Sequence, residues 1–237
     1  MNGAPALSVV VLCYRAGDAI HDVLGPLTEL LDGSGVPYEL ILVANYWNRE
    51  SDTTPDVVER YAADHALAHV VAQPKEGSMG WDMRSGFAAA SGEHVVVIDG
   101  DAQNPVEDVL RAHELLRDSD YDVVKGRRKI RHDGPYRRVL SAGYNSLFRL
   151  MFGTWGLWDI NGKPKGLRRR ALDAMTLRSD DWFIDAEIVI SARRLGFEVA
   201  EMPVIFRRND ERASFVRVSA IWEFLGNMGR ERLRLRR

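Results

Sequence analysis

Residues 94–105 read HVVVIDGDAQNP, and this stretch decides the fold assignment. The run Val95–Ile98 is apolar without alternation, which is typical of a strand buried on both faces of a sheet. Two carboxylates, Asp99 and Asp101, follow it directly, and Pro105 then opens a helical pattern. The stretch therefore predicts an interior strand, a polar loop and a helix, which is the organisation of an α/β protein.

The same alternation of apolar runs and helical patterns continues in both directions. Further strands are predicted at Ser8–Cys13, Tyr38–Ala44, His69–Ala72, Tyr121–Lys125 and Glu198–Phe206. Helices are predicted at Asp18–Leu31, Thr54–Leu67, Gly80–Ala90, Pro105 to about Arg117, Tyr136–Phe152 and Ile184–Leu195, with a Gly-rich connection over Gly153–Gly166. We expect a Rossmann-like α/β domain with a mostly parallel central sheet flanked by helices. Ligands of such sheets bind beyond the carboxyl ends of the strands.

The length of 237 residues suits one large domain. We expect this domain to span residues 1–210 and a basic helical extension to span residues 211–237. The single cysteine, Cys13, lies in an apolar run and is expected to be an inert buried thiol. No apolar run approaches the ~18 residues of a membrane span. The N-terminus lacks the basic segment of a signal peptide and is expected to form the first strand.

Charge is distributed unevenly along the chain. Residues 1–119 hold 7 Lys and Arg against 19 Asp and Glu, a balance of -12, whereas the remaining residues hold 25 against 15, a balance of +10. The first part could hold a metal ion and the second part anions. The six histidines show no zinc-like spacing, and the glycine motifs of nucleotide-cofactor dehydrogenases and P-loop enzymes are absent from the sequence.

Asp99 and Asp101 are the strongest local indication of chemistry. Alternate residues of an extended chain point the same way, so a bend at Gly100 lets the two carboxylates converge. Close carboxylates repel unless a cation lies between them, and oxygen ligands select Mg²⁺ or Mn²⁺. Gln103 offers a third oxygen. In the simpler alternative Asp101 only caps the next helix, but the position directly after a buried strand favours the metal site.

Four segments give the chain a resemblance to family 2 glycosyltransferases of the GT-A fold, and within them to the dolichol- or polyprenyl-phosphate mannosyltransferase-like branch. The segments are SVVVLCYRAGDAI (8–20), LILVANYWNRESDTTPDVV (40–58), PKEGSMGWDMRSGFAAASGEHVVVIDGDAQNP (74–105) and DWFIDAEIVISARRLGFEVAEMPVIF (181–206). The last two are the more specific, because the order and the spacing of their motifs both match.

The resemblance implies a site for a nucleotide-sugar donor. The residues implied are Asp99, Asp101 and Gln103 for the metal and the donor diphosphate, Tyr14 and Asn45 near the base and ribose, and Gly80 and Arg84 near the donor path. The chain also departs from the family pattern. Ala44-Asn45 stands where two acidic residues are usual, and Gly162-Lys163 stands where a Ser-Gly pair is common.

A basic segment, GRRKIRHDGPYRRVLSAGYN (126–145), follows. Arg137, Ser141 and Asn145 recur at i, i+4 and i+8 and share one helical face, and arginine suits bidentate phosphate binding. The resemblance implies that the phosphate of a polyprenyl-phosphate acceptor is held by Arg128, Arg137, Ser141 and Arg208. A solvated basic face is the alternative. Nucleic acid is not favoured as a partner, because aromatic stacking positions are not interleaved with the basic residues.

Asp185 and Glu187 begin a predicted helix, where acidic residues favour the helix dipole. Two positions apart, they point in different directions, so we expect at most one to face the cleft. The resemblance makes one of them a base or an acceptor-orienting group and keeps Asp159 at a site position. A phosphate acceptor is already an anion at neutral pH and needs positioning more than deprotonation. With no second placed nucleophile, we expect a single displacement that inverts the anomeric centre.

The C-terminal segment has helical apolar spacing followed by arginines. The apolar positions are Phe215, Val218, Ile221, Trp222, Leu225 and Met228, and the arginines are Arg230, Arg232, Arg234, Arg236 and Arg237. Such a helix can lie on an anionic membrane, pack on its own domain or dimerise. We favour membrane-surface docking slightly over self-packing, which predicts a cytoplasmic protein that is peripheral at the membrane.

These observations lead to one hypothesis and its alternatives. The leading hypothesis is a metal-dependent inverting glycosyltransferase that moves a hexose from a nucleoside-diphosphate sugar, of the GDP-mannose or UDP-glucose type, to a polyprenyl phosphate. The first alternative keeps the donor and takes a soluble sugar, glycan or metabolite as acceptor. A non-catalytic nucleotide-sugar-binding module is a further alternative, favoured by Ala44-Asn45. A nucleotidyltransferase ranks low, because CYRAGDAI (13–20) lacks a Gly-rich, Lys-containing triphosphate loop.

Overall fold

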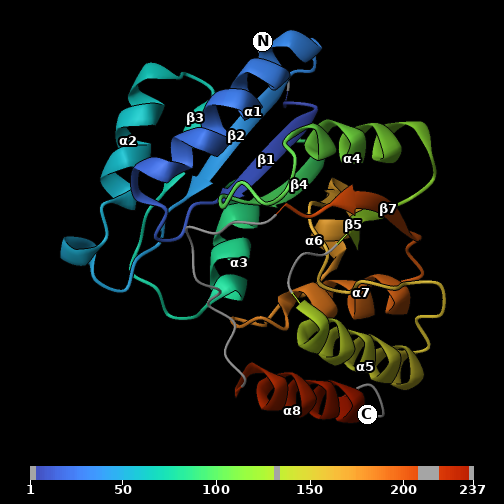
Figure 1. The fold of residues 1–237 in the computed structure, drawn as a ribbon. Coiled ribbons are helices and arrows are strands. Elements are labelled where there is room, and N and C mark those ends of the chain that lie inside the picture. The colour runs from blue at the N-terminus through green and yellow to red at the C-terminus, as the bar shows by residue number, and fades with distance from the viewer. Residues whose placement is uncertain (1–3, 131–133, 208–218, 235–237) are drawn as a thin grey trace.

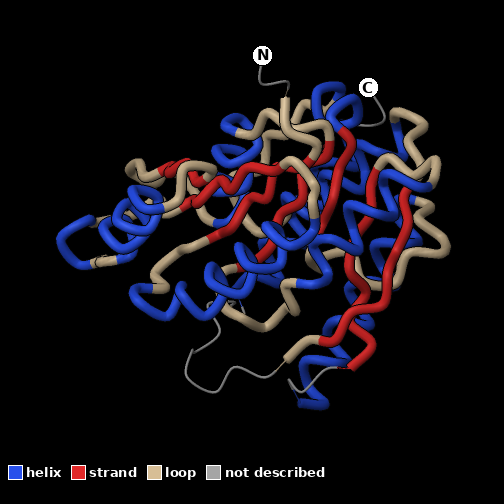
Figure 2. The backbone as a smooth tube through the Cα atoms, turned by 90° about the horizontal axis from the view of Figure 1, so that it is seen from above, coloured by secondary structure: helices blue, strands red, loops and turns tan. Residues whose placement is uncertain are grey.

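The computed structural model describes residues 4–130, 134–207 and 219–234, with 130, 134–141 and 219–225 described by their backbone alone. Within these ranges, seven strands form one sheet in the order β3-β2-β1-β4-β6-β5-β7. The strands are β1 (Leu7–Leu12), β2 (Tyr38–Val43), β3 (Ala68–Val71), β4 (His94–Asp99), β5 (Val123–Ile130), β6 (Lys165–Arg168) and β7 (Val199–Ile205). Figure 2 shows the strands side by side, with helices above and below them.

The sheet is mostly parallel, as the sequence predicts. β1 pairs in parallel with both β2 and β4, and β2 with β3. β5 and β7 are also parallel, while β6 runs antiparallel to its neighbours β4 and β5. Every residue of β1 and β2 is buried, which explains why these strands are apolar without alternation.

Helices cover both faces of the sheet (Figure 1). The described helices are α1 (His21–Ser34), α2 (Thr54–Asp64), α3 (Met79–Ala89), α4 (Glu107–Asp118), α5 (Gly134–Phe152), α6 (Arg169–Ala174), α7 (Ile184–Arg194) and α8 (Ser219–Arg234), with short 3-10 turns η1 (Gly17–Ile20) and η2 (Arg49–Ser51). One apolar core lies between the sheet and α1, α2 and α4. A second lies between the opposite face and α3, α6 and α7. A third joins α5, α7 and α8 as an outer layer.

Two elements of the second half are absent from the sequence prediction. The expected Gly-rich connection ends earlier than Gly166, because β6 begins at Lys165, and α6 follows it at once. β6 is only four residues long and has charged residues at both ends, so neither alternation nor an apolar run marks it. Its burial comes from its place between β4 and β5.

The described part of α8 packs on its own domain. Met228 is fully buried and packs in the core cluster that also contains Phe148 of α5 and Val189 of α7. The Asn227 amide also donates to the Asp181 carboxylate at 2.6 Å. Self-packing, which the sequence analysis placed second, is therefore the contact seen for this helix. The side chains at the other five predicted apolar positions lie outside the described residues, as does the expected domain boundary at residues 210 and 211.

Among the described helices, none combines the length and the apolar character needed to cross a bilayer.

Candidate active site

The loop after β4 is held in one conformation by the end of β1. The Gly100 N–H donates to the Leu12 carbonyl at 3.0 Å, and a Cβ on Gly100 would lie 2.8 Å from that oxygen and 2.6 Å from Ile20 Cδ1. Only glycine fits here, and Ala102 then takes a left-handed conformation with φ 58°. The loop starts where the chain order of the sheet reverses between β1 and β4, which is the usual ligand-binding edge of an α/β sheet.

Asp101 and Gln103 are ordered within this loop. The Asp101 carboxylate accepts from the Gln103 N–H at 3.0 Å, and the Gln103 side-chain amide donates to the Arg207 carbonyl at 3.1 Å. The Arg207 N–H in turn donates to the Gln103 carbonyl at 2.8 Å. These bonds tie the loop to the segment after β7. The side-chain oxygen of Gln103 takes no part in them.

The ligands available at this loop suit Mg²⁺ or Mn²⁺. Asp99 ends β4 with its side chain 32% exposed, so its carboxylate is open to a bound ion. Together with Asp101 and Gln103 it offers hard oxygen donors. In the part of the chain that the structure describes, no three His, Cys, Asp or Glu side chains gather as a metal site. The described residues of this loop thus offer two carboxylates and the amide oxygen of Gln103 to an ion.

The predicted base and ribose residues lie around a buried ion pair. The Lys75 ammonium lies 4.3 Å from the centre of the Tyr14 ring and forms an ion pair with Asp82. The Asn45 amide donates to Asp82 at 3.0 Å and to Ser85 at 2.9 Å. Asn45 is 1% exposed, and its side chain therefore orients the Asp82 carboxylate within the protein.

Gly80 and Arg84 both contact the segment before α7. A Cβ on Gly80 would lie 2.3 Å from the Ser179 carbonyl, so the start of α3 packs directly against this segment. Arg84 forms an ion pair with Asp180. The Glu187 carboxylate accepts from the backbone N–H groups of Arg178 and Ser179 at 3.0 and 2.8 Å. Glu187 thus fixes this segment from the side of α7.

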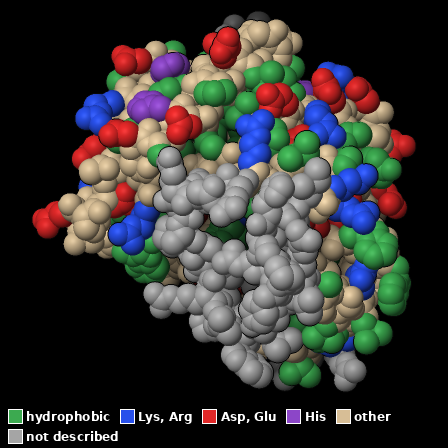
Figure 3. All heavy atoms as spheres, in the orientation of Figure 1, with side chains coloured by type: hydrophobic (Ala, Val, Ile, Leu, Met, Phe, Trp, Pro, Cys, Tyr) green, Lys and Arg blue, Asp and Glu red, His purple; other side chains and the backbone are tan. Residues whose placement is uncertain are grey.

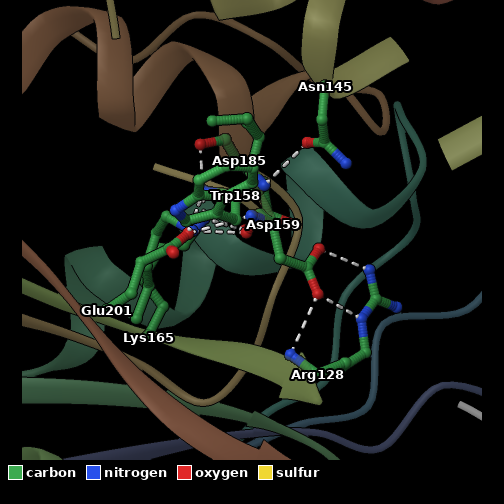
Figure 4. A network of polar contacts seen from close by, with 9 residues as sticks. Arg128, Asn145, Trp158, Asp159, Lys165, Asp185 and Glu201 are labelled. Atoms are coloured by element: carbon green, nitrogen blue, oxygen red, sulfur yellow. Dashed lines mark hydrogen bonds and ion pairs between the residues drawn. The ribbon is translucent and has the colours of Figure 1, made fainter. Parts of the chain in front are cut away.

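A group of eight charged side chains connects β5, β6, β7 and α7 with the end of β4. We call it the ionic cluster: Lys125, Lys163, Lys165 and Arg128 with Asp99, Asp159, Asp185 and Glu201. Four positive charges meet four negative ones. Figure 4 shows Arg128 facing the Asp159 carboxylate, with Asn145 bonded to the neighbouring loop. The Asn145 oxygen accepts from the Ile160 N–H at 3.1 Å.

Three pairs of the ionic cluster have short contacts. Arg128 donates to both oxygens of Asp159 at 2.7 Å. The Lys125 ammonium donates to Glu201 at 2.6 Å, and the Lys165 ammonium donates to Asp185 at 2.5 Å. Both lysines are fully buried. Such burial is tolerated only because each ammonium has a carboxylate partner.

Burial and pairing compete in setting the pKa values of this cluster. Burial lowers the pKa of Lys165 to about 8, although Asp185 opposes the change. Burial would raise the pKa of Asp159, but the hydrogen bonds and the charge of Arg128 outweigh it and lower the pKa to about 2. Lys163 and Lys165 likewise outweigh burial and lower the pKa of Asp185. Both carboxylates are therefore ionised at neutral pH.

The remaining predicted acceptor residues lie outside the described side chains, namely Arg137, Ser141 and Arg208.

On the face shown in Figure 3, lysine and arginine side chains are most frequent on the right, over the part of the molecule where α4, β7 and α7 lie in Figure 1.

The sequence analysis did not single out Lys125, Lys165 and Glu201, and it quoted Lys163 only as a departure from the family pattern. One signal was available for two of them. Lys125 follows the apolar Val123-Val124 in a predicted strand, and Glu201 interrupts the apolar pattern of another. A charge inside a strand that must be buried requires a partner.

Comparisons with known proteins show which family the chain belongs to. Residues 8–176 match the model of the family described as Glycosyl transferase family 2. Glycosyltransferase AglD of Haloferax volcanii is 30% identical over 219 residues, covering 89% of this chain and 35% of the relative. Dolichyl-phosphate beta-glucosyltransferase ALG5A of Trichomonas vaginalis is 26% identical over 218 residues, covering 86% of this chain and 66% of the relative. The chain thus spans between about a third and two thirds of the length of these two relatives.

A solved structure shares the fold. Glucosyl-3-phosphoglycerate synthase of Mycobacterium tuberculosis in complex with uridine diphosphate superposes with a TM-score of 0.70 at 19% identity, over 95% of this chain and 80% of that one. The same enzyme in complex with Mn²⁺, uridine diphosphate and phosphoglyceric acid gives a TM-score of 0.68 at 20% identity, over 97% and 76%. The family match covers more than two thirds of the chain, and the resemblance that the sequence analysis identified is confirmed. The chain belongs to glycosyl transferase family 2.

Proposed function

We propose that this chain is a metal-dependent, inverting glycosyltransferase that moves a hexose from a nucleoside-diphosphate sugar to a polyprenyl phosphate at the cytoplasmic face of a membrane. The observation that supports it best is the placement of charge around one edge of the sheet. Asp99 and Asp101 lie at the carboxyl end of β4. Lys163 then links Asp99 to the ionic cluster that contains Arg128. Two anionic reactants would meet between a bound cation and a fixed guanidinium.

On the donor side, Asp99, Asp101 and Gln103 would hold Mg²⁺ or Mn²⁺. Once bound, this ion would supply charge neutralisation for the departing nucleoside diphosphate. Tyr14 would lie near the base and ribose, with Asn45 and Asp82 fixing the wall behind it. Gly80 and Arg84 would shape the donor path by holding the segment before α7.

The state of three carboxylates supports a phosphate acceptor over a sugar hydroxyl. Asp185 is 1% exposed between two lysines, Glu187 is bonded to backbone N–H groups, and Asp159 is bonded by Arg128. Nearby cations lower the pKa of Asp159 and Asp185 and make them weak bases, whereas a hydroxyl acceptor needs a general base. A phosphate monoester has a second pKa of about 6 and attacks without one.

In the proposed reaction, a phosphate oxygen of the acceptor attacks the anomeric carbon of the donor sugar. A carbon–oxygen bond forms on one face as the bond to the diphosphate breaks on the other, and the nucleoside diphosphate leaves with the electron pair. The configuration of the anomeric carbon is therefore inverted. Arg128, with Arg137, Ser141 and Arg208, would position the acceptor phosphate. The similarity to a dolichyl-phosphate beta-glucosyltransferase supports this acceptor class.

The test measures transfer of radiolabelled sugar from GDP-mannose or UDP-glucose into the organic phase, with undecaprenyl or dolichyl phosphate present and Mn²⁺ added or chelated. We expect metal-dependent transfer from one donor and an inverted product. Release of label to water alone, preferential transfer to soluble hydroxyl acceptors, or retained configuration would contradict the proposal.

Two variants test the metal site and the acceptor-phosphate site separately. Asp101→Asn should lower transfer at least about 100-fold because a metal ligand and its charge are lost. Arg128→Lys should raise KM for the polyprenyl phosphate more than KM for the donor, because lysine lacks the planar fork. Asp118→Asn, at the exposed far end of α4, is the matched control and should leave transfer unchanged.

A further inference from the structure

One residue joins the predicted metal loop to the ionic cluster. The Lys163 ammonium lies 3.5 Å from an Asp99 oxygen and 3.2 Å from an Asp185 oxygen, and 3.1 Å from the Met79 sulfur. Lys163 is 5% exposed. Its carbon stem and its charge are therefore both enclosed within the protein.

The backbone that carries this lysine packs closely against β5. A Cβ on Gly126 would lie 2.2 Å from the Lys163 carbonyl oxygen, and a Cβ on Gly162 would lie 1.8 Å from the Gly126 carbonyl oxygen. The Gly126 N–H also donates to the Pro164 carbonyl at 2.8 Å. This packing fixes the position from which the Lys163 side chain starts, and the ion pairs with Asp99 and Asp185 hold its ammonium.

The charge count leaves Asp99 as the second counter-ion of this lysine. Asp185 contacts both Lys163 and Lys165, so one carboxylate faces two ammonium groups. That trio has a net charge of +1, and Asp99 is the carboxylate that balances it. A divalent ion at Asp99 would have to share the carboxylate with an ammonium a few ångströms away, and like charges at such distances repel strongly when they are partly buried.

We propose that Lys163 makes divalent-ion binding at Asp99 depend on the donor diphosphate. The inference rests on the proposed function, since it assumes that Asp99 and Asp101 form the metal site. The Lys163 ammonium disfavours binding of the divalent ion on its own, because both are positively charged. The negative charge of the diphosphate offsets the charges of the ion and of the ammonium together. Ion and nucleotide therefore bind cooperatively, and linkage requires each to tighten the other equally.

The experiment measures binding of Mn²⁺ by the loss of its free paramagnetic resonance signal, and binding of UDP or GDP by calorimetry, each alone and with the other. For the wild type we expect the nucleotide to tighten Mn²⁺ binding at least about tenfold, within the usual range of coupling between sites. Lys163→Met should bind Mn²⁺ alone about tenfold more tightly and reduce the coupling to about threefold or less. Lys163→Arg, which keeps the charge, should behave as the wild type. Lys129→Met removes an exposed charge from β5 and should change neither value.

The possible failures are distinguishable. If Mn²⁺ and nucleotide bind to the wild type independently, both the inference and the proposed contact between the ion and the diphosphate are overturned. If Lys163→Met folds, by circular dichroism, and binds Mn²⁺ alone no more tightly than the wild type, the inference is also wrong. If neither ligand binds any folded variant, the proposed function itself fails.

Discussion

The two halves of the sheet are stabilised in different ways. β1, β2 and most of β4 are surrounded by apolar side chains of helices on both faces. β5 and β6 instead place two fully buried lysines opposite each other, since Lys125 and Lys165 are register partners. Like charges directly opposite are destabilising in a sheet. Here Glu201, the register partner of Lys125 on β7, and Asp185 of α7 offset them. Hydrophobic burial dominates the first half, whereas the second half combines apolar contacts with specific pairing of buried charges.

The largest effect should come from removing one carboxylate of the second half. Asp185→Asn leaves Lys165 with no full negative charge in contact and should lower the free energy of unfolding by about 3–5 kcal/mol. Urea denaturation at pH 7.5 measures it. Asp173→Asn, whose exposed carboxylate lies 3.6 Å from Arg169, is the matched control and should cost less than about 0.5 kcal/mol. A cost below about 1 kcal/mol for Asp185→Asn would mean that the two halves do not differ as described.

Acid should act on the two halves in different pH windows. Burial lowers the pKa of His94, at the start of β4, to about 4 from 6.5. Its folded-state pKa lies below the unfolded value, so protons bind the unfolded chain first and stability falls as the pH drops from 6.5 to about 4. The loss should be on the order of 2 kcal/mol. Asp159, with a pKa of about 2 against 3.8, contributes stability that is lost only as the pH falls from 3.8 to about 2.

The measurement is the free energy of unfolding at pH 7.5 and pH 5. We expect His94→Gln to reduce the difference between these two values to less than half that of the wild type, and Asp159→Asn to leave it unchanged. If the His94→Gln variant shows the same difference in unfolding free energy between pH 7.5 and pH 5 as the wild type, another group controls stability in this pH range.

The smallest effect should come from a shape-tolerant change in the first half. Leu24 of α1 is fully buried in the apolar core, and Leu24→Met keeps its volume and apolar character. We expect a cost below about 1.5 kcal/mol in urea denaturation at pH 7.5. A cost as large as that of Asp185→Asn would contradict the contrast between a tolerant apolar half and a specific ionic one.

The same contrast explains what sequence reasoning could and could not predict. β1, β2, β4 and the helices between them follow from local periodicity, since every apolar run there faces an apolar layer. β6 and the ionic cluster do not, because Lys125 meets Glu201 and Arg128 meets Asp159 across 76 and 31 positions of sequence. No spacing rule reports such pairings. The loop that contains Asp99 and Asp101 was predictable from local sequence. The apolar run before it marks the end of a buried strand, and the two carboxylates follow directly.

Two residues that the resemblance places at the site have contacts that it does not imply. Asn45, expected near the base, bonds Asp82 inside the protein, and Glu187 bonds backbone N–H groups before α7. Both residues are buried and orient groups of the protein next to them. The partner of Asn45 is distant in sequence, and the partners of Glu187 are backbone N–H groups. Residue type alone therefore did not reveal these hydrogen bonds.

The most direct test of this account is the anomalous scattering of Mn²⁺ in crystals of the chain grown with Mn²⁺ and the nucleoside diphosphate that binds. We predict one strong peak that contacts Asp101 or Asp99 and both phosphates, next to the Lys163 ammonium. A diphosphate bound with no ion at the loop after β4, or an ion bound away from both carboxylates, would contradict the central claim.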